Sequence, residues 1–114
     1  MSRLSTHVLD LVSGKPAANV KIELHRLASD GSRHLVTTCT TNADGRTVAP
    51  LMADATFITG TYELCFHIGA YFVARGQIGF LDIVPIRFVI DEPDGTYHVP
   101  LLASPWSYST YRGS

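Results

Sequence analysis

Three stretches of this chain alternate apolar with polar residues at every second position, namely 20–25, 62–68 and 84–90. Successive side chains of a strand point to opposite faces, so a period of two predicts strands that bury one face. The Thr-rich stretch 35–41 also suits a pleated surface. Turn-forming Gly, Pro, Asn and Asp residues separate these stretches at short intervals, which is typical of an antiparallel sandwich or barrel. We therefore predict an all-β fold of about eight strands in two sheets.

Two segments depart from the simple strand pattern. Residues 70–75, followed by Gly76, match one short helix with a glycine just past its end. Pro100 lacks a backbone N–H, so the strand-like segment 97–102 is expected at a sheet edge or at a bulge beside this proline. Edge strands invite pairing with another copy of the chain, and we therefore expect a homo-oligomer.

Composition narrows the classes of partner. The chain has 114 residues, which suits one domain over 1–114, and it is 46% apolar and 17% charged, as in ordered globular proteins. Its formal net charge is −1 and its basic residues are scattered, so no nucleic-acid partner is expected. The most apolar stretch, 78–90, is interrupted by charged residues and a proline, and no membrane partner is expected either.

The N-terminus and the cysteines predict a cytoplasmic location. Met1 leads into the strand-like segment 4–11 without the apolar region and cleavage site of a secretory signal. Cys39 and Cys65 both lie in strand-like segments, and we interpret them as small buried apolar residues in a reducing compartment. A disulfide between them stays open at this stage.

Common catalytic signatures are missing from the sequence. It contains no Gly-x-Ser-x-Gly nucleophile elbow, no His-Glu-x-x-His zinc motif and no Cys-x-x-Cys pair. The glycines in Gly76-Gln77-Ile78-Gly79 have the wrong spacing for a phosphate-binding loop. We therefore expect neither a metal nor a cofactor.

Five histidines remain as candidate chemical groups. His25, His34 and His67 fit surface positions, on the polar face of a strand or beside a turn. His7 and His98 differ, because each is embedded in an otherwise uncharged strand segment. Taken alone, a hydrogen-bonded, half-buried histidine is still the commoner interpretation of both.

The chain ends on an unusually aromatic segment. Trp106, Tyr108 and Tyr111 lie within the last nine residues, whereas most termini are polar and mobile. Such a segment predicts a strand that packs against something. Taken alone, Tyr111 fits interface packing and Ser114 a frayed end, while Arg46 fits an exposed arginine after an Asp-Gly turn.

Four motifs together resemble the transthyretin-like 5-hydroxyisourate hydrolases. They are Leu-Ser-Thr-His-Val-Leu-Asp at 4–10, Asn-Ala-Asp-Gly-Arg at 42–46, Tyr-His-Val-Pro-Leu-Leu at 97–102 and the closing Tyr-Arg-Gly-Ser at 111–114. The resemblance implies a transthyretin-like (prealbumin-like) two-sheet antiparallel β-sandwich. It also implies hydrolysis of 5-hydroxyisourate to 2-oxo-4-hydroxy-4-carboxy-5-ureidoimidazoline in urate breakdown, without metal or cofactor. The chain departs from the family at 81–82 and 106–107, away from the matched polar residues.

The resemblance also implies roles for individual residues. His7, Arg46 and His98 match the catalytic positions, while His7, Arg46, Tyr111 and Ser114 match positions that contact the substrate. A histidine is suited to deprotonating water near neutral pH. An arginine can bind the edge of a planar heterocycle and stabilise a developing negative charge. Which histidine is the base stays open.

The family assembles as a homotetramer, a dimer of dimers, with sites at the subunit interface lined by the N-terminal strand and the tail. Two alternatives to a hydrolase remain. One is a hormone-type small-molecule carrier such as transthyretin itself, which shares the fold but lacks the closing Tyr-Arg-Gly-Ser and the matched histidines. The other is a structural sandwich module of a larger protein, although the sequence shows no linker.

Overall fold

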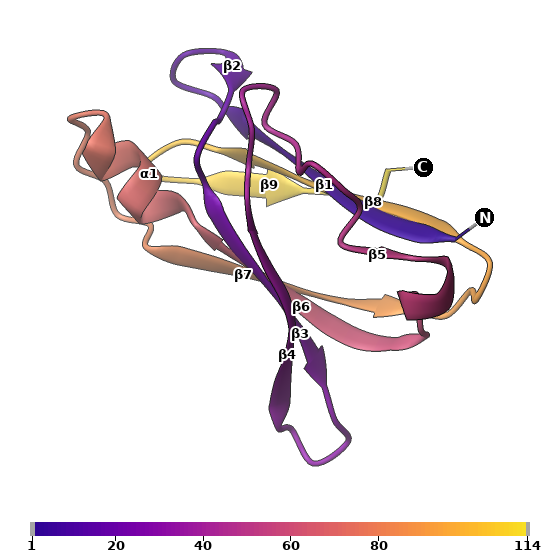
Figure 1. Cartoon of the computed structure of the whole chain (residues 1–114). Helices are drawn as coiled ribbons and strands as arrows, with labels where there is room; N and C mark the ends of the chain where they lie inside the picture. The colour runs from indigo at the N-terminus through magenta and orange to yellow at the C-terminus, as the bar shows by residue number, and fades with distance from the viewer. Residues whose placement is uncertain (1, 114) are drawn as a thin grey trace.

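Two β-sheets pack face to face around one apolar interior in the computed structural model, which describes residues 2–113 (Figure 1). The first sheet has the order β2-β1-β8-β9, with β5 also paired to β1. Its strands are β1 (Arg3–Asp10), β2 (Lys15–Pro16), β5 (Met52–Ala53), β8 (Thr96–Ala103) and β9 (Tyr108–Thr110). The second sheet has the order β4-β3-β6-β7. Its strands are β3 (Lys21–Leu27), β4 (Arg33–Thr40), β6 (Gly60–His67) and β7 (Ile83–Ile90). The predicted two-sheet sandwich is confirmed.

The alternation in the sequence decides which face of each strand is buried. In β6, Tyr62, Leu64 and Phe66 are at most 1% exposed, and they meet side chains such as Leu4 and Val8 of β1 in one cluster. Burying a side chain of this size contributes about 1.5–3 kcal/mol. Because β1 and β8 bury one face in this interior, their opposite faces are free to carry polar groups.

β1 and β8 run parallel, which departs from the antiparallel prediction. Their register pairs Arg3 with Thr96 and continues without a shift to Asp10 and Ala103. Adjacent parallel strands need a long crossover connection, and here the whole second sheet lies between them in the chain. The pairing brings the first and last long strands of the chain side by side.

Pro100 lies neither on a sheet edge nor beside a bulge in the pairing of β8 with β1 and β9, so the prediction of an edge or a bulge is wrong. β8 has β1 on one side and β9 on the other. The ladder between β8 and β9 ends at the pair Leu101 and Thr110, and the same register resumes at an isolated bridge between His98 and Gly113. Pro100 lies in the gap, where it has no N–H to donate. An interior position is tolerated because the proline interrupts pairing only locally.

The predicted short helix is α1 (Ile68–Ala74), at one end of the sandwich (Figure 1). Gly76 follows it with a φ of 75°, a left-handed conformation that suits glycine. The hydroxyl of Tyr71 donates a 2.8 Å hydrogen bond to Asp10, which ties the helix to the end of β1. A short 3₁₀ helix, η1 (Asp54–Thr56), was not predicted. No helix within residues 2–113 has the length and apolar character needed to cross a membrane.

Candidate active site

The structure brings His7, His98 and Arg46 together on the outer face of the first sheet. His7 in β1 pairs with Pro100, and His98 in β8 pairs with Ser5, so the two histidines lie on neighbouring strands. The residues on either side of each histidine along its own strand are buried and point into the apolar interior. Both imidazoles therefore lie on the other face of the sheet. Arg46 reaches the other edge of β1 through an isolated bridge to His7. Three sequence motifs therefore meet in one place.

The turn at 42–46 holds Arg46 against β1. The side-chain oxygen of Asn42 accepts hydrogen bonds from the amides of Asp44 and Arg46, at 2.9 and 3.2 Å. Gly45 has a φ of 73°, and its carbonyl accepts a 2.8 Å hydrogen bond from the amide of Val8. Asparagine and glycine are the residues that such a turn requires. The motif is thus a docking turn that places an arginine beside His7.

A glycine packs against each of the two imidazole rings. A Cβ added to Gly45 would lie 3.2 Å from Cδ2 of His7, and one added to Gly113 would lie 3.1 Å from Cδ2 of His98. The amide of Gly113 also donates a 2.7 Å hydrogen bond to the carbonyl of His98. Close approach to a histidine ring therefore accounts for Gly45 in the motif at 42–46 and for Gly113 in the motif at 111–114.

Burial and positive charge keep both histidines neutral near neutral pH. Burial is the main cause that lowers the pKa of His7, and the charge of Arg46 lowers it further, while Asp44 acts in the opposite direction. The pKa of His98 is lowered by burial and then by Arg46, His7 and Arg3. A neutral imidazole offers one lone pair and one N–H, which suits proton transfer and hydrogen bonding in the same site.

Sequence reasoning missed Ser5, which contacts His98 directly. The Ser5 hydroxyl oxygen lies 2.9 Å from Nδ1 of His98. The alternation in β1 places Ser5 on the same face as His7, but its neighbour across the sheet depends on the parallel register with β8. A hollow of about 250 Å³ adjoins this position and is lined by Arg3, Ser5, Thr6, Arg46, Thr47, Val48, Ala49 and Pro50.

The tail forms the predicted strand, and its aromatic side chains are largely exposed. β9 pairs with β8, while Trp106 is 65% and Tyr111 60% exposed. Tyr111 lies in the chain between β9 and the bridge at Gly113, and it lines a hollow with Phe88, Tyr97 and Arg112 that contains none of the three clustered residues. Ser114 lies outside the described residues. An exposed aromatic surface of this kind is typical of a site that another chain covers.

A second polar cluster lies on the outer face of the second sheet. Glu23, His25 and Cys65 have possible ligand atoms within 4.8 Å of one another. A nitrogen of Arg33, however, lies 3.2 Å from both His25 and Cys65 and 2.9 Å from Glu63. The guanidinium already contributes a positive charge among these groups. The cluster is therefore a hydrogen-bonded ion network and not a site prepared for a metal.

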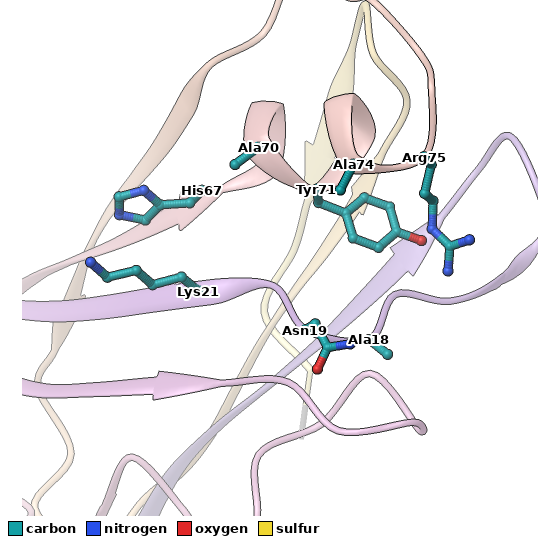
Figure 2. A pocket seen from close by; sticks show the side chains of 8 residues that line it. All are labelled: Ala18, Asn19, Lys21, His67, Ala70, Tyr71, Ala74 and Arg75. Carbon is teal, nitrogen blue, oxygen red and sulfur yellow. The ribbon is translucent and has the colours of Figure 1, made fainter.

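A hollow of about 360 Å³ lies beside α1. Figure 2 shows His67 and Lys21 at one end of it and Tyr71 and Arg75 at the other. Several of its polar groups contact neighbours, although Nε2 of His67 makes no hydrogen bond within residues 2–113. Glu23 lies 3.8 Å from Lys21 and 3.5 Å from His67, and Tyr71 donates to Asp10. The hollow contains none of the residues of the His7 and His98 cluster, so we do not assign it to the same chemistry.

The fold and the cluster define a transthyretin-like sandwich that carries a histidine and arginine site on one sheet. The model of the HIUase/Transthyretin family matches residues 4–113, and the chain belongs to this family. The chain is 56% identical over 116 residues to 5-hydroxyisourate hydrolase 2 of Rhizobium meliloti (strain 1021). That match covers 98% of this chain and 96% of the relative.

Solved structures with this fold include an enzyme and transthyretins, one of them in complex with thyroxine. An (S)-allantoin synthase structure is 47% identical with a TM-score of 0.93, and the match covers 99% of this chain but only 44% of that one. Transthyretin from Sparus aurata is 30% identical with a TM-score of 0.91, over 97% of this chain and 96% of that one. The fold alone therefore does not separate catalysis from binding.

Proposed function

We propose that this protein hydrolyses 5-hydroxyisourate to 2-oxo-4-hydroxy-4-carboxy-5-ureidoimidazoline, and that residues 1–114 act as one hydrolase domain. The observation that carries the proposal is the meeting of His7, His98 and Arg46 on one face of the first sheet. The high identity to a 5-hydroxyisourate hydrolase over nearly the full length of both chains supports it. In the reaction, water adds to a ring carbonyl carbon and the bond from that carbon to the ring nitrogen breaks.

His7 is the general base in this mechanism. Burial and the charge of Arg46 lower its pKa, against the opposing effect of Asp44, so the ring is neutral and one of its nitrogens carries the proton. The other nitrogen of the neutral ring then carries the lone pair. It takes a proton from the attacking water, and the resulting imidazolium returns this proton to the leaving ring nitrogen. General acid–base catalysis of this kind contributes about 10²–10⁴-fold.

His98 and Arg46 stabilise the negative charge that develops on the carbonyl oxygen. Arg46 is always charged, and its planar donors match the edge of the heterocycle. His98 is neutral because its pKa is lowered by burial and by nearby positive charge. The one N–H of the neutral ring acts as a hydrogen-bond donor to this oxygen. Tyr111 and Ser114 are assigned to substrate contact, as the sequence motifs predict. The mechanism uses no metal and no cofactor.

The proposal includes a homotetramer, a dimer of dimers, with sites at the subunit interface. The exposed side chains of Trp106, Tyr108 and Tyr111, together with the edge position of β9, support such an assembly. Gel filtration with light scattering tests it, and a stable monomer would contradict it. A cytoplasmic location also belongs to the proposal, since Cys39 and Cys65 are both free, as suits a reducing compartment.

An absorbance time course tests the activity. Freshly generated 5-hydroxyisourate is mixed with the protein, and its ultraviolet absorbance is followed against the spontaneous decay. We expect faster decay, in proportion to the protein concentration. A preparation in which both His7 and His98 are replaced by Asn controls for contaminating enzymes. Decay at the spontaneous rate would contradict the hydrolase, and saturable ligand binding without turnover would favour the carrier.

A further inference from the structure

We propose that Ser5 is a positioning residue for His98: its hydroxyl donates to Nδ1, which leaves the proton of the neutral ring on Nε2, the nitrogen that faces the substrate. This inference rests on the proposed function, because it concerns how His98 acts as a hydrogen-bond donor in that reaction. It assigns a role to a residue that neither contacts the reacting atoms nor stands out in the sequence.

The contact is built by the pairing of the two strands. Ser5 and His98 are direct partners in the parallel register of β1 and β8, and Ser5 Oγ lies 2.9 Å from Nδ1. Gly113 packs against the same ring from the tail, where an added Cβ would lie 3.1 Å from Cδ2 and 3.2 Å from Cβ of His98. The imidazole is thus held by the hydroxyl of a residue in β1 on one side and by a glycine of the tail, beyond β9, on the other.

Hydrogen-bond accounting favours Ser5 as the donor. Nδ1 of His98 is the only side-chain hydrogen-bond partner of the Ser5 hydroxyl within residues 2–113. If Nδ1 carried the proton, Ser5 would accept it and the hydroxyl proton would need another acceptor. If Ser5 donates, the hydroxyl proton and the lone pair of Nδ1 satisfy each other. The second arrangement leaves neutral His98 with an N–H at Nε2.

The tautomer matters because only one of the two can donate from Nε2. A neutral imidazole with its proton on Nδ1 would present a lone pair to the developing oxyanion and repel it. With the proton on Nε2, the same ring donates a hydrogen bond to that oxygen. A partner at the other ring nitrogen commonly decides which of these forms is present. Ser5 therefore couples the strand register to the chemistry of His98.

The chain offers a matched control at the next residue. Thr6 also links β1 to β8, through a 2.7 Å hydrogen bond from its hydroxyl to the carbonyl of Val99. It is 1% exposed and points into the interior, away from His98. Thr6→Val removes a hydroxyl link between the same two strands without touching the imidazole. It therefore separates a loss of strand pairing from a loss of histidine positioning.

The test compares Ser5→Ala, Ser5→Thr and Thr6→Val in the full-length protein. We expect Ser5→Ala to lower kcat by about 10–100-fold with little change in KM, as for other residues that orient a functional histidine. Ser5→Thr keeps the hydroxyl and should recover most of that loss. Thr6→Val should keep kcat and lower only the thermal midpoint. Unchanged kcat in Ser5→Ala would overturn the proposal, and so would an equal loss of kcat in Thr6→Val.

Nitrogen-15 NMR of the histidine rings gives a readout that does not depend on turnover. We expect His98 of the unaltered protein at neutral pH to show the form protonated at Nε2, and Ser5→Ala to show a mixture of both forms. A spectrum of the form protonated at Nδ1 in the unaltered protein would overturn the proposal. If that protein failed to hydrolyse 5-hydroxyisourate, the proposed function would fall, while the spectrum would still decide the role of Ser5. Full activity in both the unaltered protein and the Ser5→Ala variant would overturn only the role of Ser5.

Discussion

His7 and His98 lie on the same face of two adjacent parallel strands, with His7 opposite Pro100 and His98 opposite Ser5. The two imidazoles are thus offset by one pleat, and the single charge of Arg46 lowers the pKa of both. Burial is the larger cause in both cases, and one arginine, held by a turn at the neighbouring edge of β1, adds to the lowering of both pKa values.

Removing the charge of Arg46 should raise the pKa of both histidines. Burial and Arg46 together make protonation unfavourable and hold each pKa below the ordinary value of about 6.5. In Arg46→Gln we expect the pKa of each histidine to move up toward that value, so that protonation begins at higher pH. Arg46→Lys keeps a positive charge and should preserve most of the lowering. NMR titration of the ring protons measures this, and identical curves in all three proteins would contradict it.

Replacing each histidine by Asn should separate the base from the donor. Because the pKa of His7 is lowered, the acid limb of kcat/KM in the unaltered protein should lie below pH of about 6.5. His98→Asn should lower kcat by about 10²–10³-fold, as for other oxyanion donors, and keep that limb. His7→Asn should lower kcat by about 10²–10⁴-fold and abolish the limb. If the limb disappears in His98→Asn and persists in His7→Asn, the two roles are reversed.

Gly45→Ala should destabilise the fold more than Gly76→Ala. The two glycines have nearly the same φ, 73° and 75°, so alanine carries a similar backbone cost of about 1–2 kcal/mol at either position. A Cβ at Gly45 would lie 2.5 Å from the carbonyl oxygen of Val8, whereas nothing lies within 4 Å of one at Gly76. Overpacking should add about 1–3 kcal/mol at Gly45.

Urea unfolding of both glycine variants measures this difference, because the backbone term is common to the two. We also expect Gly45→Ala to lower activity, since the added methyl group would lie 3.2 Å from the ring of His7. Equal losses of unfolding free energy in the two variants would show that crowding against β1 is unimportant.

Deletion of residues 111–114 should abolish activity while leaving the sandwich folded. It removes the bridge between Gly113 and His98 and the assigned contact residues Tyr111 and Ser114, but it keeps the pairing of β9 with β8. We expect a loss of kcat with a small change in the thermal midpoint. Trp106→Ala, which trims another exposed aromatic of the tail, is the control for a general loss of apolar surface. Retained turnover after the deletion would refute the role given to the tail.

Much of the sandwich follows from local patterns. The alternation at 62–68 predicts β6 and its buried face, and Gly76 marks the residue just past the end of α1. The prediction failed at Pro100, because sequence patterns show that a hydrogen bond is lost but not whether the neighbouring strand is present. The helix η1 was missed as well, since three residues carry no periodicity.

Part of the candidate site could likewise be predicted from the sequence, and part could not. The motifs led to His7, Arg46 and His98 by their resemblance to a family, while Ser5 entered only through its 2.9 Å contact with His98. Serine in a strand has no pattern of its own that marks a functional role. Its role depends entirely on the residue placed opposite it.

The sequence by itself determined which segments form the long strands, which faces hold the apolar interior and which polar residues belong to motifs, while the two-residue strands β2 and β5 were not predicted. These properties depend on neighbours a few positions away, through the period of two and the backbone demands of turns. Only the tertiary structure decided that β1 and β8 pair in parallel, which places Ser5 against His98 and Arg46 beside His7. Ser5 and His98 are 93 positions apart, and their contact is set by how two sheets close around a shared interior. Local periodicity contains no information on that register.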